Sequence, residues 1–328
     1  MNFKDENDYP VMLSICVPTY NHERYIRQAL ESIFMQKTNY SYEVLVGEDK
    51  STDNTKKVIE EIEKERHPEL KVFYREHNMN DSDYWNAIDL MDRARGKYLI
   101  FLEGDDFWID ENKIEMQISF LENNNEYIAV AHNCIVVDQN SNIIDEKYDE
   151  CIDEEYTIEH YACEILPGQT TTLLMRNFYY IPSIDTSFIR KKLLPGDRRV
   201  MFTLVSYGKI HCIQKKMSAY RHIVDSGESW SAKHRYCYEE TKQWFSEQLE
   251  YAKKINYKKG IYIADYMLYA AIRQAFVIYK AISFQEYLAE RKLVENVFRC
   301  QLIMFIRDIN RYLLRKKVFF PVLDKYIK

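Results

Sequence analysis

Two adjacent carboxylates, Asp105 and Asp106, follow an apolar run at residues 98–102. That run has the composition of a buried strand, so the pair is expected at the end of a strand. Carboxylate oxygens are the hard ligands that divalent cations prefer, and a pair of them at a strand end can hold a cation against a phosphate. Paired aspartates are also common in plain surface turns. The chemistry of this pair therefore depends on the segments around it.

Polar loops also follow two other predicted strands. The segment at residues 19–21 follows an apolar run at residues 12–18, and Asp49 follows a second run at residues 43–47. Both runs are rich in β-branched residues, which favour buried strands. Because the carboxyl ends of parallel strands meet at one edge of a sheet, we expect the three loops to lie together.

Strand and helix patterns alternate four times in the first third of the chain. Capping side chains at residues 51–53 precede the second predicted helix, and Gly96 is the expected end of the third. The predicted strands lie at residues 12–18, 43–47, 71–74, 98–102, 127–137, 171–176 and 209–213, and the predicted helices around residues 26–34, 58–62, 83–95 and 197–207. From about residue 236 onward only helix is predicted. This order indicates an α/β fold with a mostly parallel central sheet flanked by helices, followed by an all-helical C-terminal extension.

The composition is that of a soluble globular protein. Hydrophobic residues make up 46% of the 328 residues, and no apolar run approaches the roughly 18 to 20 residues that a membrane-spanning helix needs. Residues 1–8 are acidic and polar, unlike the basic-then-apolar layout of a signal peptide. We therefore expect a cytoplasmic protein.

Charge and cysteine usage argue against several classes of protein. The net charge of -6 provides no basic field over the whole chain, so no nucleic-acid partner is expected. The seven cysteines are scattered and include no Cys-x-x-Cys pair, which argues against a disulfide framework and against a structural zinc site.

Three segments, at residues 14–21, 48–55 and 103–108, occur in the order and at the strand ends typical of one enzyme family. Together they resemble the family 2 glycosyltransferases of GT-A fold, in particular the inverting bacterial members that use nucleotide-sugars. The resemblance is close over the first 110 residues and continues to about residue 232. It implies a catalytic domain at residues 1–232 and a helical extension at residues 233–328.

The resemblance implies that the first two segments bind a nucleotide. Asp49 would accept a hydrogen bond from uracil, with Pro18 and Tyr20 lining the base, and a carboxylate suits the imide N–H of that ring. The family pattern here is Asp-Asp-Gly-Ser, and this chain has Glu48 and Lys50 in place of the first Asp and the Gly. The alternative is that this loop only caps the following helix.

The third segment resembles the family's metal-binding pair. Asp106 would ligate Mg²⁺ or Mn²⁺ directly, and Asp105 would lie nearer the ribose or a coordinated water. A later segment implies that Arg221 contacts phosphate and that His222 ligates the metal or the diphosphate. His222 could instead have a purely structural partner.

The remaining family roles fall on residues further along the chain. Asp197, at the start of a predicted helix, resembles the general base that deprotonates the acceptor hydroxyl, although a helix-capping aspartate is the alternative. Gln169, Thr170 and Trp230 resemble residues on the acceptor side. The implied reaction is a direct displacement that inverts the anomeric carbon, moving a sugar from a UDP-sugar donor to a saccharide or lipid-linked acceptor in cell-surface polysaccharide synthesis.

Two other functions remain open from sequence alone. A nucleotidyltransferase should carry a glycine-rich, basic loop near the first strand, and none of the eight glycines lies there. A non-catalytic nucleotide- or sugar-binding module would be favoured by loss of the carboxylate pair or of the base, and both are retained.

The C-terminal segment at residues 302–320 mixes large apolar and basic side chains. Such a helix can lie on an anionic bilayer, which predicts peripheral association with the cytoplasmic face of the membrane through the basic C-terminal helices. The alternative is a helix packed on the catalytic domain with a solvated basic face.

Overall fold

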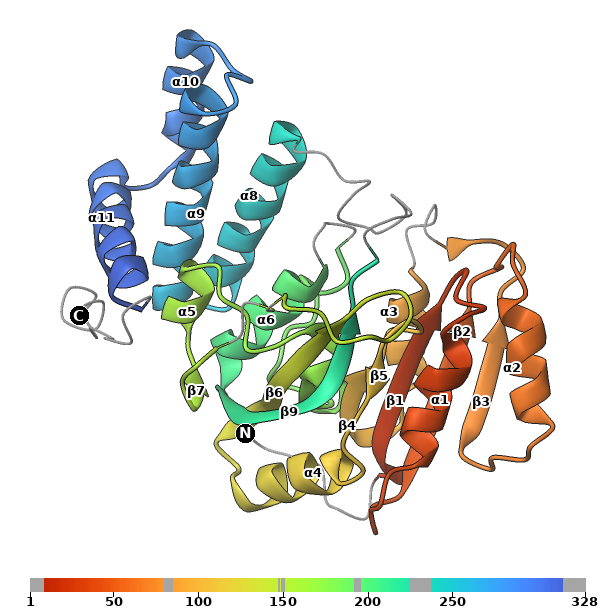
Figure 1. Ribbon diagram of the computed structural model, residues 1–328. Helices are drawn as coiled ribbons and strands as arrows, with labels where there is room; N and C mark the ends of the chain where they lie inside the picture. The colour runs from red at the N-terminus through yellow and green to blue at the C-terminus, as the bar shows by residue number, and fades with distance from the viewer. Residues whose placement is uncertain are drawn as a thin grey trace. The chain divides into compact units, whose positions relative to one another are not determined.

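The chain folds into two compact units in a computed structural model, shown in Figure 1. The structure describes residues 9–79, 85–146, 148, 151–191, 196–223 and 237–314. The first unit comprises Met1–Tyr156, Leu166–Thr186 and Tyr207–Trp230, and the second comprises Thr157–Ile165, Ser187–Ser206 and Ser231–Lys328. The carboxylate pair belongs to the first unit and Asp197 to the second.

A mixed sheet forms the centre of the first unit. Within the described residues it has nine strands in the order β3-β2-β1-β4-β8-β6-β9-β5, with β7 beside β9. The strands are β1 (Val11–Thr19), β2 (Tyr42–Glu48), β3 (Leu70–Tyr74), β4 (Gly96–Phe101), β5 (Phe107–Trp108), β6 (Tyr127–Val137), β7 (Glu155–Tyr156), β8 (Leu174–Arg176) and β9 (Lys209–Arg221). The first four neighbours, β3 to β4, are parallel, whereas β8 runs antiparallel to both β4 and β6. The predicted α/β fold is confirmed, with a parallel arrangement in the half that ends in the three polar loops.

Amphipathic helices cover this sheet. They are α1 (Ile26–Phe34), α2 (Thr55–Glu63), α3 (Asn86–Arg93) and α4 (Lys113–Asn123). In α1 the fully buried residues Ile26, Leu30 and Ile33 recur at helical spacing and join the core formed by β1, β2 and β4. Figure 1 shows α1 and α2 together on one face of the parallel strands. Each crossover therefore returns the chain so that the next strand ends at the same edge.

Three elements differ from their predicted form. Gly96 does not end a helix but begins β4. Glycine is required there, because a Cβ would lie 2.5 Å from the backbone nitrogen of Ser14 on the neighbouring strand. The strand predicted at residues 171–176 begins as a 3₁₀ turn, η3 (Thr170–Thr172), and only β8 is extended. The strand predicted at residues 209–213 continues as β9 to Arg221. The propensities of the residues alone do not predict these three differences, because they depend on contacts with neighbouring strands.

Helices make up the second unit in the described residues. They are α5 (Ile158–Ala162), α6 (Gly196–Tyr207), α8 (Tyr238–Lys254), α9 (Lys258–Val277), α10 (Phe284–Glu290) and α11 (Val297–Leu314), with the 3₁₀ turn η5 (Arg291–Leu293) between the last two. Another 3₁₀ turn, η4 (Phe178–Tyr180), belongs to the first unit. Figure 1 shows α8 and α9 side by side, and α11 also packs on α9. The helical C-terminal extension is thus confirmed over the described residues 237–314. No helix in the described ranges is both long enough and apolar enough to cross a membrane.

The division of the chain differs from the predicted single boundary at residues 232 and 233. Residues 157–165 and 187–206 group with the C-terminal helices rather than with the sheet. Tyr161 donates a 2.8 Å hydrogen bond to Gln248, and the ring of Phe188 stacks on Tyr251 with centroids 5.1 Å apart. These contacts are long-range in sequence, so a boundary inferred from pattern alone does not reveal them.

One buried carboxylate ties together the starts of the parallel strands. Glu43 on β2 accepts hydrogen bonds from Ser14 Oγ at 2.8 Å, Lys71 Nζ at 2.8 Å and Arg95 Nη2 at 2.8 Å. These partners outweigh the cost of burial and lower the pKa of Glu43 to about 2. The carboxylate thus fixes the alignment of the parallel strands relative to one another, and with it the positions of their opposite ends.

We expect Glu43→Gln to lower the free energy of unfolding at neutral pH by roughly 2–4 kcal/mol, because a neutral amide leaves the basic partners poorly paired. The pKa of Glu43 is lowered from 4.5 to about 2, so its stabilisation is present above pH 4.5 and is lost as the pH falls toward 2. The variant should therefore approach the wild type in acid. Urea unfolding at neutral pH and at about pH 2.5 measures this difference. The exposed Glu65→Gln is the control, whose stability should stay close to that of the wild type, and an equally small effect of Glu43→Gln would contradict the assignment.

Candidate active site

The carboxyl ends of β1, β2 and β4 meet at one edge of the sheet. The backbone nitrogen of Asp49 donates to Thr19 O at 3.0 Å, and that of Gly104 donates to Pro18 O at 3.2 Å. The loops after β2 and β4 are thereby each hydrogen bonded to the end of β1. The predicted gathering of the three polar loops is confirmed.

A close approach of the third loop to β1 brings a histidine to the carboxylate pair. A Cβ on Gly104 would lie 2.6 Å from both Thr19 Oγ1 and His22 Nδ1, so this position requires glycine. His22 Nε2 lies 3.9 Å from Asp105 Oδ2. His22 was not predicted from the sequence, although its place three residues after β1 puts it at the same edge of the sheet.

Asp106 is the most constrained carboxylate of this edge. Its side chain is buried, with 2% of the residue exposed. Oδ1 accepts the backbone N–H of Arg221 at 2.8 Å, and Oδ2 accepts Nε2–H of Gln169 at 2.8 Å. Burial, followed by the negative charge of Asp105, raises the pKa of Asp106 well above its usual value. Both carboxylate oxygens are therefore held in fixed directions.

Asp105 differs from its neighbour in exposure. Its side chain retains 28% of its accessible surface and lies beside His22. Burial and then the charges of Asp106 and Asp105 raise the pKa of Tyr220 to about 12, which places that phenol in the field of the pair. The site thus combines one fixed, buried carboxylate with one that faces outward.

The donor set of the pair fits a divalent cation of the Mg²⁺ or Mn²⁺ type. Each oxygen of Asp106 accepts one hydrogen bond and retains further lone pairs for a ligand. Among the described residues, the ligand atoms of Asp105, Asp106 and His222 do not all converge within 4.8 Å. The arrangement therefore resembles sites in which one or two carboxylates share a cation with substrate phosphates, rather than a closed protein cage.

His222 lies at the end of β9 with a carboxylate partner of its own. Its backbone nitrogen donates to Val137 O at 2.9 Å, and its Nδ1 lies 2.6 Å from Glu146 Oε2. This partner orients the ring, as second-layer carboxylates do for ligating histidines. The same contact would also be present if His222 had only a structural role, so the ligand role of His222 stays a prediction. Glu146 was not singled out from the sequence.

Arg221 supports the site from inside rather than facing a phosphate. Only 3% of the residue is exposed. Its Nε donates to Asp105 O at 2.7 Å, Nη1 to Asp138 O at 3.0 Å and Nη2 to Gln28 Oε1 at 2.9 Å. The guanidinium also lies over the ring of Tyr25, 4.4 Å from its centroid. The phosphate contact predicted for Arg221 is therefore corrected to a structural clamp on the loop that carries the pair.

Asp49 is buried at the end of β2, with 3% of the residue exposed. Its Oδ1 accepts the backbone N–H of Met79 at 2.8 Å, and burial raises the pKa of the carboxyl. The helix-capping alternative does not apply, because Asp53 Oδ1 accepts the N–H of Thr55 at the start of α2, at 2.9 Å. Asp49 therefore has no capping role, and its contact with uracil stays a prediction.

The loop around Asp49 keeps the backbone shape of a glycine turn. Lys50, which stands in place of the family glycine, has a left-handed backbone with φ of 60°. Ser51 N–H closes the turn onto Glu48 Oε1 at 2.7 Å. Tyr20, directly after β1, is 37% exposed and Pro18 is half-buried, and their contact with a base stays a prediction.

The residues predicted on the acceptor side lie in different surroundings. Gln169 is buried, with 5% of the residue exposed, and its amide is engaged with Asp106 and with Thr171. Its predicted contact with the acceptor is therefore corrected to a contact with the carboxylate pair. Thr170 is half-buried at the start of η3. Trp230 lies outside the described residues.

Asp197 occupies the first turn of α6 in the second unit. Its Oδ1 accepts the backbone N–H of Arg198 at 2.7 Å, and the residue is half-buried. This contact is compatible with a helix-terminal role and leaves the carboxylate accessible for proton transfer. The role of general base stays a prediction.

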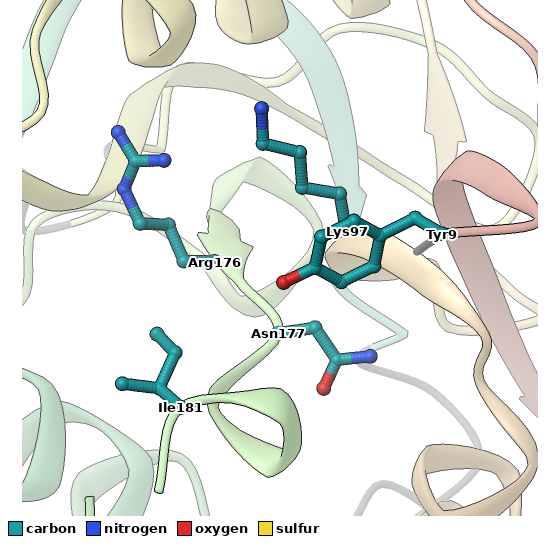
Figure 2. Close-up of a pocket in the computed structure, with 5 residues that line it drawn as sticks. All are labelled: Tyr9, Lys97, Arg176, Asn177 and Ile181. Atoms are coloured by element: carbon teal, nitrogen blue, oxygen red, sulfur yellow. The ribbon is translucent and has the colours of Figure 1, made fainter. Parts of the chain in front are cut away.

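A shallow pocket lies away from these residues, near the amino end of β4. Figure 2 shows it lined by Tyr9, Lys97, Arg176, Asn177 and Ile181. The guanidinium of Arg176 donates to the backbone oxygens of Tyr127 at 2.8 Å and Leu121 at 2.6 Å. Because these polar groups bind the protein itself, the pocket has a structural explanation, and none of the predicted site residues lines it.

Comparisons with known proteins agree with the fold. A family model described as glycosyl transferase family 2 matches residues 14–182. The Escherichia coli protein named UDP-Glc:alpha-D-GlcNAc-diphosphoundecaprenol beta-1,3-glucosyltransferase WfgD is 34% identical over 136 residues, covering 40% of this chain and 50% of WfgD. The uncharacterized protein Rv1520 of Mycobacterium tuberculosis is 36% identical over 121 residues, covering 37% of this chain and 34% of its own. The chain thus spans between a third and a half of the length of these relatives.

Solved structures show the same fold. Staphylococcus aureus TarS 1-349, crystallised with UDP-GlcNAc, superposes with a TM-score of 0.59 at 18% identity, covering 86% of this chain and 79% of that chain. The same protein crystallised with UDP gives a TM-score of 0.56 at 19% identity, covering 84% and 76%. The matched family region contains the first two loops and the carboxylate pair.

Proposed function

The chain belongs to glycosyl transferase family 2, and from this membership we propose that it transfers a sugar from a nucleoside-diphosphate donor to a hydroxyl group. The observation that carries the proposal is the meeting of the Asp49 loop and the Asp105–Asp106 pair at one edge of the sheet. Ligands of open α/β sheets bind at the carboxyl ends of the strands. A base-binding carboxylate and a phosphate-side carboxylate pair are thus available in one unit.

We propose a UDP-sugar as the donor. An aspartate carboxylate at position 49 is an acceptor with no competing donor, which suits the imide of uracil. WfgD is named for UDP-Glc, and TarS was crystallised with UDP and with UDP-GlcNAc. The proposed acceptor is a saccharide or a lipid-linked saccharide of a cell-surface polysaccharide, a class that includes the diphosphoundecaprenol acceptor in the name of WfgD.

In the proposed mechanism each residue has one task. Asp49 orients the base, and Asp105 and Asp106 would hold a Mg²⁺ or Mn²⁺ ion at the diphosphate end of the donor. The cation, when bound, would supply the positive charge that a departing diphosphate needs. Asp197 accepts the proton of the acceptor hydroxyl, which attacks the anomeric carbon opposite the nucleotide and inverts its configuration.

Thermal unfolding in the presence of UDP, GDP, CMP and dTDP, each with Mn²⁺ and with a chelator, tests this function. We expect the largest rise in melting temperature with UDP and Mn²⁺, because a ligand that binds only the folded state stabilises it. A different preferred base would overturn the uracil assignment to Asp49. Stabilisation that is the same with the chelator would overturn the role of the carboxylate pair.

We also propose that the second unit meets an anionic membrane surface through α11. Phe298, Leu302 and Phe305 follow helical spacing and are 77%, 38% and 64% exposed, whereas Cys300 and Ile303 on the other side are buried. Residues 291–328 carry ten basic and three acidic side chains in a chain whose net charge is -6. Exposed apolar groups combined with local positive charge favour the interface of an anionic bilayer. Such a position at the cytoplasmic face would bring the enzyme to a lipid-linked acceptor.

The double variant Phe298→Ser, Phe305→Ser should lower partition onto anionic vesicles by about tenfold or more, because each exposed ring loses an apolar burial term of about 1 kcal/mol or more. Vesicle flotation measures the bound fraction. Ile278→Ser is the matched control, since Ile278 is also exposed, at 61%, but lies at the end of α9. Point variants are preferable to truncation, because Asp265 in α9 accepts the N–H of Glu295 at 2.8 Å and anchors the start of α11. Equal flotation of the double variant and the wild type would contradict the proposal.

A further inference from the structure

The side-chain amide of Gln169 has only one orientation that satisfies its neighbours. Its Oε1 accepts both the backbone N–H and the hydroxyl of Thr171, each at 2.7 Å. Its Nε2 donates to Asp106 Oδ2 at 2.8 Å. A flipped amide would set its NH₂ against the backbone N–H of Thr171 and its oxygen against the carboxylate of Asp106. The contacts on both sides therefore direct an N–H donor at Asp106.

The turn that carries Gln169 is itself held by buried contacts. Thr172 Oγ1 donates back to the carbonyl of Gln169 at 2.7 Å, and Gln117 Nε2 on α4 donates to Thr172 O at 2.8 Å. Gln117 is in turn held by Lys113 Nζ at 2.6 Å, and both of these side chains are fully buried. A Cβ on Gly168 would lie 2.3 Å from Thr172 Oγ1, so the turn also depends on a glycine. The donor on Gln169 thus comes from a rigid support rather than from a mobile loop.

The opposite oxygen of Asp106 is held by a different element. The backbone N–H of Arg221, at the end of β9, donates to Oδ1 at 2.8 Å. This donor is fixed by the strand and does not depend on the identity of any side chain. Gln169 is therefore the side chain that completes a two-sided grip on Asp106, and side-chain rotation of Asp106 would break a buried hydrogen bond on each side.

We infer that Gln169 is a positioning residue that holds the Asp106 carboxylate in the orientation required to bind the cation. This inference rests on the proposed function, because it assigns Gln169 to the same cation site. It replaces the expected role of Gln169 on the acceptor side with one that acts through Asp106. When a residue that orients a metal ligand in this way is substituted, the affinity for the metal changes even though the residue does not contact the metal.

Gln169→Glu tests the inference at a single atom. The variant keeps an oxygen that accepts from Thr171 and replaces the Nε2–H₂ donor by a second oxygen facing Asp106. We expect the affinity for Mn²⁺ in the presence of UDP, measured by calorimetric titration, to fall about 10- to 100-fold. UDP binding in a chelator should stay close to that of the wild type, whereas the melting temperature of the unliganded protein should fall, because the new carboxyl group is buried beside Asp106. A purely structural role would leave the Mn²⁺ affinity of the folded protein unchanged.

Two further variants keep the test decisive. Gln214→Glu is the matched control, since Gln214 Nε2 donates to backbone carbonyls such as that of Cys212 at 3.1 Å, and its Mn²⁺ affinity should match the wild type. Thr171→Val keeps Gln169 but removes the hydroxyl that fixes its amide, so it should weaken Mn²⁺ binding by a smaller factor of about threefold. Thr171→Val serves as the test if the Gln169→Glu variant does not fold. Unchanged Mn²⁺ affinity in the folded variants would overturn the role of Gln169 alone, whereas no Mn²⁺ binding by the wild type would overturn it together with the proposed function.

Discussion

Asp106→Asn should lower kcat/KM for sugar transfer by about 10³-fold, because removing a carboxylate that supports metal-assisted charge stabilisation costs about 4 kcal/mol in the transition state. The buried carboxylate accepts from Arg221 N–H and from Gln169 Nε2–H. An asparagine has one oxygen and one NH₂ group, so it can accept only one of these two bonds. The variant thus loses both the charge and part of the grip that orients the side chain.

Release of UDP from a UDP-sugar donor, followed at saturating acceptor, measures the effect of Asp106→Asn. Asp110→Asn is the matched control, because Asp110 follows β5 closely in sequence and pairs with Lys215 at 2.5 Å outside the grip on Asp106. Its activity should stay within about tenfold of the wild type, as expected for loss of a partly exposed ion pair. If Asp106→Asn retained activity comparable to that of Asp110→Asn, the carboxylate pair would not be part of the chemistry.

Asp197→Asn should lower kcat by about 10²- to 10⁴-fold, the usual contribution of a general base. The contact of Asp197 with the backbone N–H of Arg198 can also be made by an asparagine oxygen, so α6 should still form. UDP binding should be unchanged, because Asp49 and the carboxylate pair lie in the other unit. This split between turnover and nucleotide affinity distinguishes a base from a residue that binds the donor.

Glu159→Gln provides the comparison for Asp197→Asn. Glu159 also lies in the first turn of a helix of the second unit, α5, and pairs with Lys259 at 3.4 Å. Both variants remove one negative charge from a helix start, so both lose a similar interaction with the helix dipole. Only Asp197→Asn should lose turnover. Equal activity of the two variants would remove Asp197 from the mechanism.

The positions of the carboxylate pair and of the Asp49 loop were predictable from sequence. Apolar runs of strand length marked the cores of β1, β2 and β4, and the alternation with helices implied parallel neighbours whose ends meet at one edge. The residues that immediately follow a strand are placed by that strand alone. Asp49, Asp105 and Asp106 therefore fell into one region without any knowledge of side-chain packing.

The partners of these residues could not be predicted in the same way. Gln169 reaches Asp106 because η3 packs against β4, β6 and β9, and Arg221 lies beside Asp106 because β9 continues past its pairing with Phe107 and Trp108 of β5. Both contacts join segments at least 60 residues apart, since Gln169 and Asp106 are separated by 63 positions and Arg221 and Asp106 by 115. Sequence pattern indicates which residues are polar, whereas only the tertiary fold determines whether a polar group faces a substrate or another side chain.

The affinity for UDP in the presence of Mn²⁺, compared with the affinity in a chelator, tests the central claim most directly. Calorimetric titration of the full chain measures both values without knowledge of the sugar or the acceptor. A donor site formed by Asp49 and the carboxylate pair predicts that UDP binds at least about tenfold more tightly with Mn²⁺, since the cation joins the diphosphate to the protein. Equal affinity under both conditions, or no binding of UDP at all, would contradict the account.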